Sequence, residues 1–273
     1  MSSCSRREVL GVLGSALIGG VAGGMAVNLA TPGDALSAPS KSGDKQALWV
    51  PHKLDAAACA PLAYDGYWDR GLGCCYGTFY SIVGSLGKQY GAPYNQFPFT
   101  MMEVGKSGIS EWGTICGALL GAASAYALFW GRKERDPMVT ELFRWYEQTA
   151  FPVYNPGDKA QGVKEAIPPT KSGSVLCHIS VSTWCQATGT DASSPKRSER
   201  CSRLTADVAI KAIEIMNAKI AGSFAAAGTS KAEEACGSCH GKGKQSPILK
   251  GRMDCTPCHS GSAHVQDKFN KHP

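Results

Sequence analysis

The chain has 273 residues, 43% of them hydrophobic, and a formal net charge of +6 at pH 7. This length is enough for one sizeable domain, or for one domain with a small appendage. Because the positive excess is modest and spread along the chain, it gives no indication of nucleic-acid binding, and we expect no nucleic-acid partner.

Residues 1–38 have the pattern of a twin-arginine signal peptide. Arg6 and Arg7 precede an uncharged run rich in Gly and Ala over residues 9–29, and residues 35–38 (ALSA) offer a cleavage site for signal peptidase. The run is long enough to remain as a membrane anchor, but its six glycines favour cleavage. We therefore expect a periplasmic protein with no stable membrane span after the signal is removed.

Residues 49–227 predict a helical domain. Apolar and small residues recur at helical spacing over residues 74–90, with Gly91 as the end of that helix. Residues 113–131 carry no charge, but the charged flanks favour a buried central helix over a membrane span, with its start at residues 110–112. An amphipathic helix is predicted over residues 136–149 and a long helix over residues 205–226.

The segments around these helices are predicted to be less regular. Residues 155–173 are rich in Pro, Gly and Lys and predict a surface loop, whereas residues 174–183 have strand character. Residues 228–273 contain few apolar side chains, so this tail cannot form a core by itself. The predicted fold is mostly α, a helical N-terminal domain with a loop-rich C-terminal appendage.

Two C-x-x-C-H motifs lie in that appendage, CGSCH at residues 236–240 and CTPCH at residues 255–259. The pattern attaches haem c, because its two thiols bond to the haem vinyl groups and the histidine binds the iron. Paired C-x-x-C units also fit a zinc ribbon, but a histidine directly after both pairs favours haem. We expect two haems per chain, bound covalently by Cys236, Cys239, Cys255 and Cys258, with His240 and His259 as proximal ligands.

The second axial ligand of each iron decides between electron transfer and catalysis, since an open iron binds a small substrate. The other histidines are His52, His178, His264 and His272. His264 is too near His259 to reach the far side of its own haem, but it could reach the other one. We expect His178 and His264 to be distal ligands. In the alternative, His178 hydrogen-bonds to a cysteine, and His264 and His272 bind the irons.

The remaining cysteines, apart from Cys4 in the signal, are seven in number: Cys59, Cys74, Cys75, Cys116, Cys177, Cys185 and Cys201. Disulfides are the first interpretation in an exported protein. Seven thiols cannot all pair within one chain, however. The twin-arginine route exports folded proteins, often with a cofactor inserted beforehand, whereas haem c is attached after export. The sequence therefore suggests a second cofactor.

From Cys74 onward the sequence resembles the C_GCAxxG_C_C family, which is named for its spaced cysteines and glycines. The stretches that carry the resemblance are GCCYG at residues 73–77, GTICGAL at 113–119, CHISVSTWC at 177–185 and RC at 200–201. The signal and the haem motifs add a resemblance to haem-bearing members. The resemblance implies a homodimer, haems stacked in pairs with two histidines on each iron, and an iron–sulfur cluster in the helical domain.

Four cysteines match the family pattern, and four thiolates are what a [2Fe–2S] or [4Fe–4S] cluster requires. They are Cys74, Cys116, Cys185 and Cys201. Cys75 and Cys177 leave the ligand set ambiguous, and disulfides or idle buried thiols remain the alternatives. The leading hypothesis is an electron carrier that exchanges electrons with redox protein partners and is not an enzyme. A small haem reductase with one open iron is the alternative.

Overall fold

The computed structural model describes residues 48–249 and 251–253. Three sets of predictions lie outside these residues. They are the signal peptide at residues 1–38, the second haem motif with Cys255, Cys258 and His259, and the histidines His264 and His272.

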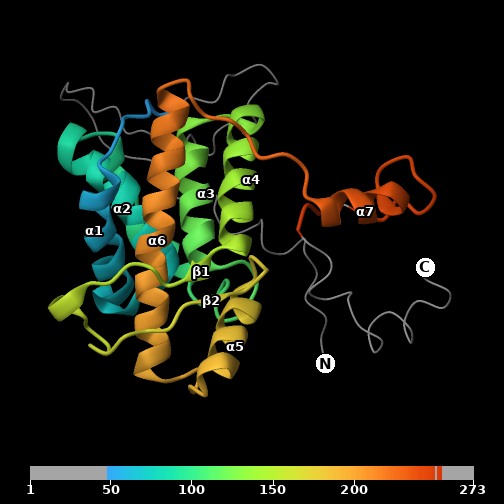
Figure 1. Cartoon of the computed structure of the whole chain (residues 1–273). Coiled ribbons are helices and arrows are strands. Elements are labelled where there is room, and N and C mark those ends of the chain that lie inside the picture. Colours follow the sequence, from blue (N-terminus) through green and yellow to red (C-terminus); the bar gives the residue numbers. More distant parts are fainter. Residues whose placement is uncertain (1–47, 250, 254–273) are drawn as a thin grey trace, which may run out of the picture. The chain divides into compact units, whose positions relative to one another are not determined.

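The body is a bundle of long helices, and the prediction of a mostly α fold is confirmed (Figure 1). Each helix begins and ends as follows: α1 Ala56–Trp68, α2 Gly73–Tyr90, α3 Gly117–Phe129, α4 Arg132–Gln148, α5 Cys177–Thr188, α6 Pro195–Ile220 and α7 Lys231–His240. Short 3-10 turns cover Asp69–Gly71, Tyr94–Gln96, Phe99–Gly105 and Gly157–Lys159. Strand β1 (Ala150–Phe151) pairs antiparallel with β2 (Thr170–Lys171).

Helix α6 is the longest element of the described part and packs against α1, α2, α3 and α4. Ser194 caps its N-terminus by accepting from the amide of Arg197, and Pro195 follows at the first helical position. The largest fully buried side chains come from several helices, among them Phe79 on α2, Tyr126 on α3 and Leu142 on α4. The apolar core therefore lies between the helices of the bundle.

Close contact between α2 and α3 depends on small residues. A Cβ atom on Gly121 of α3 would lie 2.4 Å from the carbonyl oxygen of Cys75 on α2, so only glycine fits there. This approach brings the start of α2, which carries Cys74 and Cys75, against the start of α3, which Cys116 precedes. The helix packing therefore sets the positions of these cysteines.

Residues 177–183 are helical rather than extended, so the prediction of strand character over residues 174–183 is wrong. Ser180 and Trp184 are the buried residues of α5, and their spacing of four places both on one helix face. An isolated bridge between Ile115 and Leu176 ends just before the helix begins. The preference of Val, Ile and Thr for strands is therefore overridden by the burial of this face.

The predicted start of the central helix at residues 110–112 is also wrong. Residues 107–111 all have positive φ, from 48° to 73°, and form a left-handed turn, while α3 begins only at Gly117. Helix α6 begins at Pro195, earlier than the predicted residue 205. No helix within the described ranges is both long enough and apolar enough to cross a membrane.

Candidate metal centre and haem-binding helix

Four cysteines from four different elements meet beside the bundle core. Cys74 lies in the first turn of α2, Cys116 directly before α3, Cys177 at the start of α5 and Cys201 in α6. Burial, and after it the nearby thiols of Cys116, Cys201 and Cys177, raise the pKa of Cys74 well above its usual value. The geometry agrees for two of them, because a Cβ atom on Gly117, the residue after Cys116, would lie 2.6 Å from the sulfur of Cys74. We call these four residues the cysteine cluster.

The cysteine cluster carries hydrogen-bond donors for negatively charged sulfur. Burial raises the pKa of Cys116, but the Tyr146 hydroxyl and the backbone amides of Ala118 and Leu119 oppose this shift by donating to the sulfur. The two amides belong to the N-terminus of α3, where a helix stabilises negative charge. Burial also raises the pKa of Cys177 to about 12. Without a metal or another positive charge, the thiols would therefore remain protonated.

The predicted ligand set is brought together only in part. Cys74, Cys116 and Cys201 are neighbours, whereas Cys185 lies near Cys201 and is half-buried. Cys177, outside the predicted set, is near both Cys116 and Cys201. Cys75 is fully buried and packs on Gly105. Across the described ranges, no three His, Cys, Asp or Glu side chains stand in ligating geometry.

A buried arginine borders the cysteine cluster. Arg200 is 1% exposed, and its Nη1 lies 3.9 Å from the sulfur of Cys201. Its Nη2 donates to Ser180 Oγ at 2.9 Å, while its Nε has no hydrogen-bond partner among the described residues. A buried guanidinium is costly unless negative charge compensates it. The charge of Arg200 therefore fits a cysteine centre that is anionic.

Arg200 is linked to Cys116 through two hydroxyl groups. The oxygens of Ser180 and Tyr146 lie 2.9 Å apart, and Tyr146 also hydrogen-bonds to Cys116. Because hydroxyl protons can rotate, one consistent arrangement exists. In it, Arg200 donates to Ser180, Ser180 donates to Tyr146, and Tyr146 donates to the sulfur of Cys116. No pattern in the sequence pointed to Arg200, Ser180 or Tyr146 as functional residues. The one local signal was the position of Arg200 directly before Cys201.

The left-handed turn fixes the start of α5. The amide of Cys177 donates to the carbonyl of Thr114 at 2.6 Å, and the amide of His178 donates to Gly113 at 3.0 Å. Gly108 has a φ of +73°, and a Cβ there would lie 2.9 Å from the Cβ of Cys177. Only glycine therefore allows the turn to pack against Cys177. The neighbouring His178 is exposed, so its ring is accessible to a group outside the described residues.

Helix α7 carries the first haem motif. Ser230 caps it by accepting from the amide of Glu233, and residues three and four apart share a helix face, which places Cys236, Cys239 and His240 on one side. The Nδ1 atom of His240 lies 3.2 Å from the carbonyl of Ser246, which favours a proton on Nδ1 and a lone pair on Nε2. This is the usual state of an iron-binding histidine, so the helix fits haem attachment.

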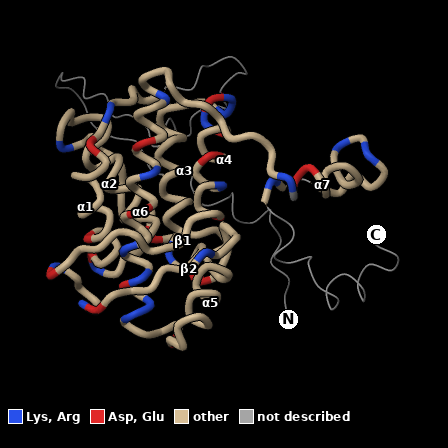
Figure 2. Tube along the Cα trace, viewed as in Figure 1, with Lys and Arg blue, Asp and Glu red and all other residues tan. Residues whose placement is uncertain are grey.

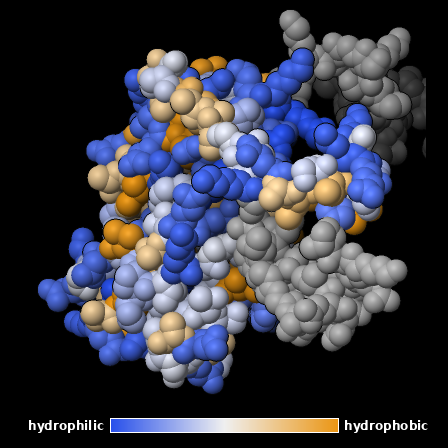
Figure 3. Space-filling view, turned by 45° about the vertical axis from the view of Figure 1, so that its right-hand side comes forward, coloured by the Kyte–Doolittle hydropathy of each residue, from blue (hydrophilic) through white to orange (hydrophobic). Residues whose placement is uncertain are grey.

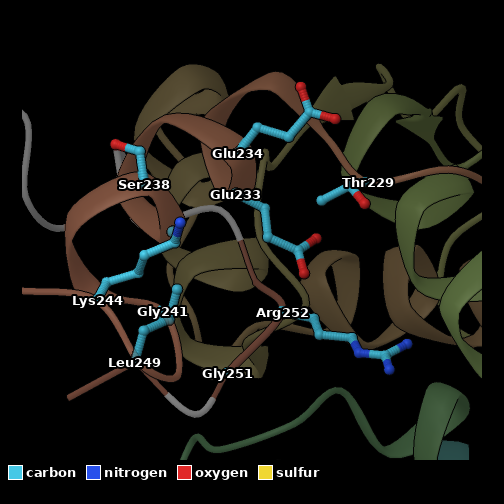
Figure 4. Close-up of a pocket in the computed structure, with 10 residues that line it drawn as sticks. Thr229, Glu233, Glu234, Ser238, Gly241, Lys244, Leu249, Gly251 and Arg252 are labelled. Carbon is cyan, nitrogen blue, oxygen red and sulfur yellow. The ribbon is translucent and has the colours of Figure 1, made fainter. Parts of the chain in front are cut away.

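A hollow of about 520 Å³ lies beside this motif. Gly237, Ser238 and Gly241 form part of its wall, with Leu249 as its apolar side chain, and Figure 4 shows Glu233 pointing into it near Arg252. The acidic residues Glu233 and Glu234 lie in the first turn of α7, and basic residues follow in the loop after the helix (Figure 2). Cys236, Cys239 and His240 do not line this hollow, so it lies beside the haem-binding face of α7 and is bordered by charged groups. Haem would supply the apolar mass that this part of the chain lacks.

Comparison with known proteins supports the resemblance that the motifs indicated. Residues 76–215 match the family model C_GCAxxG_C_C, described as a putative redox-active protein. The chain is 54% identical over 275 residues to split-Soret cytochrome c of Desulfovibrio desulfuricans, covering 98% of this chain and 99% of that protein. A solved structure of split-Soret cytochrome c from that organism, described as containing a novel iron centre, matches with a TM-score of 0.78 and 60% identity. The match covers 82% of this chain and 95% of the solved one. The chain therefore belongs to the C_GCAxxG_C_C family, and it is similar over nearly its whole length to split-Soret cytochrome c.

Proposed function

We propose that the chain is a periplasmic electron carrier with two covalent haems in its C-terminal tail and an iron–sulfur centre in its helical domain. The cytochrome name and the iron centre of the similar proteins support this proposal. Both kinds of group change oxidation state by one electron. The chain's own residues hold them, set their charge environment and limit their contact with water.

The observation that carries the iron–sulfur part is the buried charge of Arg200 beside the cysteine cluster. Its guanidinium is almost fully buried and forms no close ion pair with a carboxylate in the described ranges, although its charge also acts on the more distant carboxyl of Asp207. Neutral thiols would not compensate that charge. An iron–sulfur cluster held by four thiolates is anionic, so it would offset the desolvation cost of the arginine.

We propose Cys74, Cys116 and Cys201 as three of the cluster ligands, with Cys185 or Cys177 as the fourth. Cys185 completes the pattern that the family resemblance implies. The electrostatic interaction of Cys177 with both Cys116 and Cys201 supports the other choice. Iron bound by thiolates requires these cysteines to be reduced.

The tail supplies the haem sites. Cys236 and Cys239 attach the first haem and His240 binds its iron, and the motif at residues 255–259 does the same for the second haem. We propose His178 and His264 as distal ligands. One of them could come from the partner in a homodimer, which would couple folding of the haem region to dimerisation.

Anaerobic purification followed by analysis of iron, acid-labile sulfide and haem tests the whole proposal. Two haems per chain are expected in the intact mass, together with sulfide and with more iron than the haems account for. Zinc without haem would overturn the cytochrome part. A native disulfide at Cys116 or Cys201 would overturn the cluster part.

A further inference from the structure

We propose that α4 carries electrons between the iron–sulfur centre and the first haem, through Tyr146 on one face of the helix and Arg144 on the other. The inference rests on the proposed function, because it needs both redox groups. It goes further by assigning a route between them to residues outside the two binding motifs.

The first observation is that α4 presents two neighbouring residues to opposite sides. Tyr146 is fully buried and hydrogen-bonds to Cys116 of the cysteine cluster. Arg144 precedes it by two positions, which turns its side chain by about 200° around the helix axis. One side of α4 therefore faces the cysteine cluster, and the other faces away from it.

The second observation is that the face with Arg144 binds the haem-bearing segment. Arg144 forms an ion pair with Glu233 of α7, and the side chains are only 11% and 19% exposed. One turn earlier on α4, Thr140 accepts a hydrogen bond of 3.2 Å from Arg252. Thr140 and Arg144 are four residues apart and share a face of α4. Two contacts thus fix the segment at the same place.

The third observation concerns the position of Glu233 within α7. Glu233 precedes Cys236 by three residues and shares a helix face with it. It also lines the hollow beside the haem motif (Figure 4). An ion pair shielded from water is weakened less by salt than an exposed pair. Arg144 therefore positions the residue that attaches the first haem.

These contacts form a continuous route. It runs from the sulfur of Cys116 through Tyr146 and the backbone of α4 to Arg144, and then through Glu233 and α7 to Cys236. Helix α4 separates the cysteine cluster from Glu233, and an α-helix has a diameter of about 10–12 Å including side chains. Electron tunnelling weakens steeply with distance and is favoured by bonds over gaps. With both groups bound, one electron would pass between the cluster iron and the haem iron along this route, so that one iron is oxidised as the other is reduced, and no proton would move.

The test compares the rate of electron transfer within the full chain after rapid photoreduction. Arg144→Gln and Glu233→Gln should each slow transfer severalfold, and the double variant should be little slower than either one, because both changes break the same contact. Arg132→Gln is the matched control. Arg132 lies on α4 but is exposed and pairs with Asp136, so the rate should not change.

Tyr146→Phe separates the route from the positioning of the tail. It keeps the ring but removes the hydroxyl next to Cys116, so transfer should slow while hydrogen–deuterium exchange in residues 231–240 stays unchanged. Arg144→Gln should raise that exchange. An unchanged transfer rate in Tyr146→Phe, or unchanged exchange and rate in Arg144→Gln, would overturn the inference. If the wild-type protein lacks iron and sulfide beyond its haem, the proposed function fails separately, and the exchange data still show whether Arg144 holds α7.

Discussion

Arg203 donates from Nε to Glu199 Oε1 at 2.7 Å, in an ion pair that is almost fully buried within α6. The carboxylate of Glu199 also accepts from the Tyr64 hydroxyl at 2.9 Å and from the amide of Gly162 at 2.9 Å. Glu199 thereby links α6 to α1 and to the loop after β1. Polar contacts with a buried carboxylate thus help to hold the loop against the helices.

Glu199→Gln should destabilise the protein by about 3–5 kcal/mol, because it leaves the buried charge of Arg203 without its partner. Urea unfolding of both proteins, monitored by circular dichroism, measures the difference. Glu165→Gln is the matched control, since Glu165 pairs with Lys196 at an exposed site. That change should cost less than about 1 kcal/mol. Equal losses in the two variants would contradict the role of Glu199.

The titration of Asp207 makes the free energy of unfolding depend on pH. Its carboxylate accepts from the amides of Val153 at 2.9 Å and Tyr154 at 2.7 Å, but burial raises its pKa to about 6. The folded protein therefore binds this proton more tightly than the unfolded chain, whose Asp pKa is about 3.9. The stability from this group is present below about pH 4 and is lost as the pH rises through about 6.

Asp207→Asn should remove this fall in stability, which amounts to at most about 3 kcal/mol between pH 4 and pH 7. Unfolding curves at a series of pH values measure it. Asp158→Asn, on an exposed turn, should leave the pH profile of the wild type unchanged. A profile in Asp207→Asn that matches the wild type would mean that Asp207 does not titrate in this range.

The sequence predicted the elements whose signal is local. Helix α2 follows from helical spacing over residues 74–90, and α3 follows from its uncharged run. The left-handed turn could not be predicted, because its positive φ angles are held by packing against Cys177, far along the chain. Helix α5 was not predicted, because the sequence does not show that Ser180 and Trp184 are its buried residues. Only that knowledge shows the four-residue spacing of a helix face.

The same distinction applies to the site. The family resemblance predicted three members of the cysteine cluster, and the C-x-x-C-H motif predicted the residues on α7. The surrounding hydrogen bonds come from Tyr146 on α4, Ser180 on α5 and Arg200 on α6. Their association depends on how three helices pack. Sequence spacing carries no information about it.

The fourth cluster ligand can be identified by substitution. Cys74→Ser, Cys116→Ser and Cys201→Ser should each strongly reduce cluster iron and sulfide. Of Cys177→Ser and Cys185→Ser, the variant that loses the cluster identifies the fourth ligand. Cys59→Ser is the control, because Cys59 is buried but hydrogen-bonds to Ser85 outside the cysteine cluster. Retention of sulfide in Cys116→Ser would contradict the proposed centre.

Arg200 should set the reduction potential of the centre. Adding an electron to an anionic cluster is easier beside a buried positive charge, so Arg200→Met should lower the cluster potential while the haem potentials stay the same. Arg200→Lys should lower the cluster potential less than Arg200→Met does, because lysine keeps the charge but not the hydrogen bonds. Redox titration followed by electron paramagnetic resonance measures this. Equal potentials in wild type and Arg200→Met would exclude an electrostatic role.

His178 should be a distal haem ligand. Its backbone is held by Gly113 at the start of α5, while its ring is exposed, so the imidazole lies on a fixed element and can reach iron from outside the bundle. The face in Figure 3 shows apolar side chains only in separated patches, which offer little surface for packing a haem. A bond from His178 to the iron would therefore help to hold a haem against the body. His178→Ala should give one high-spin haem per chain, carbon monoxide binding to the reduced protein, and a weaker dimer.

His52→Ala is the control, since the ring of His52 is stacked on Tyr90 at 3.9 Å. Two low-spin haems and an unchanged dimer in His178→Ala would exclude this ligand. Rapid stoichiometric carbon monoxide binding to the wild-type protein would instead support the haem reductase, because an open iron is what that function requires.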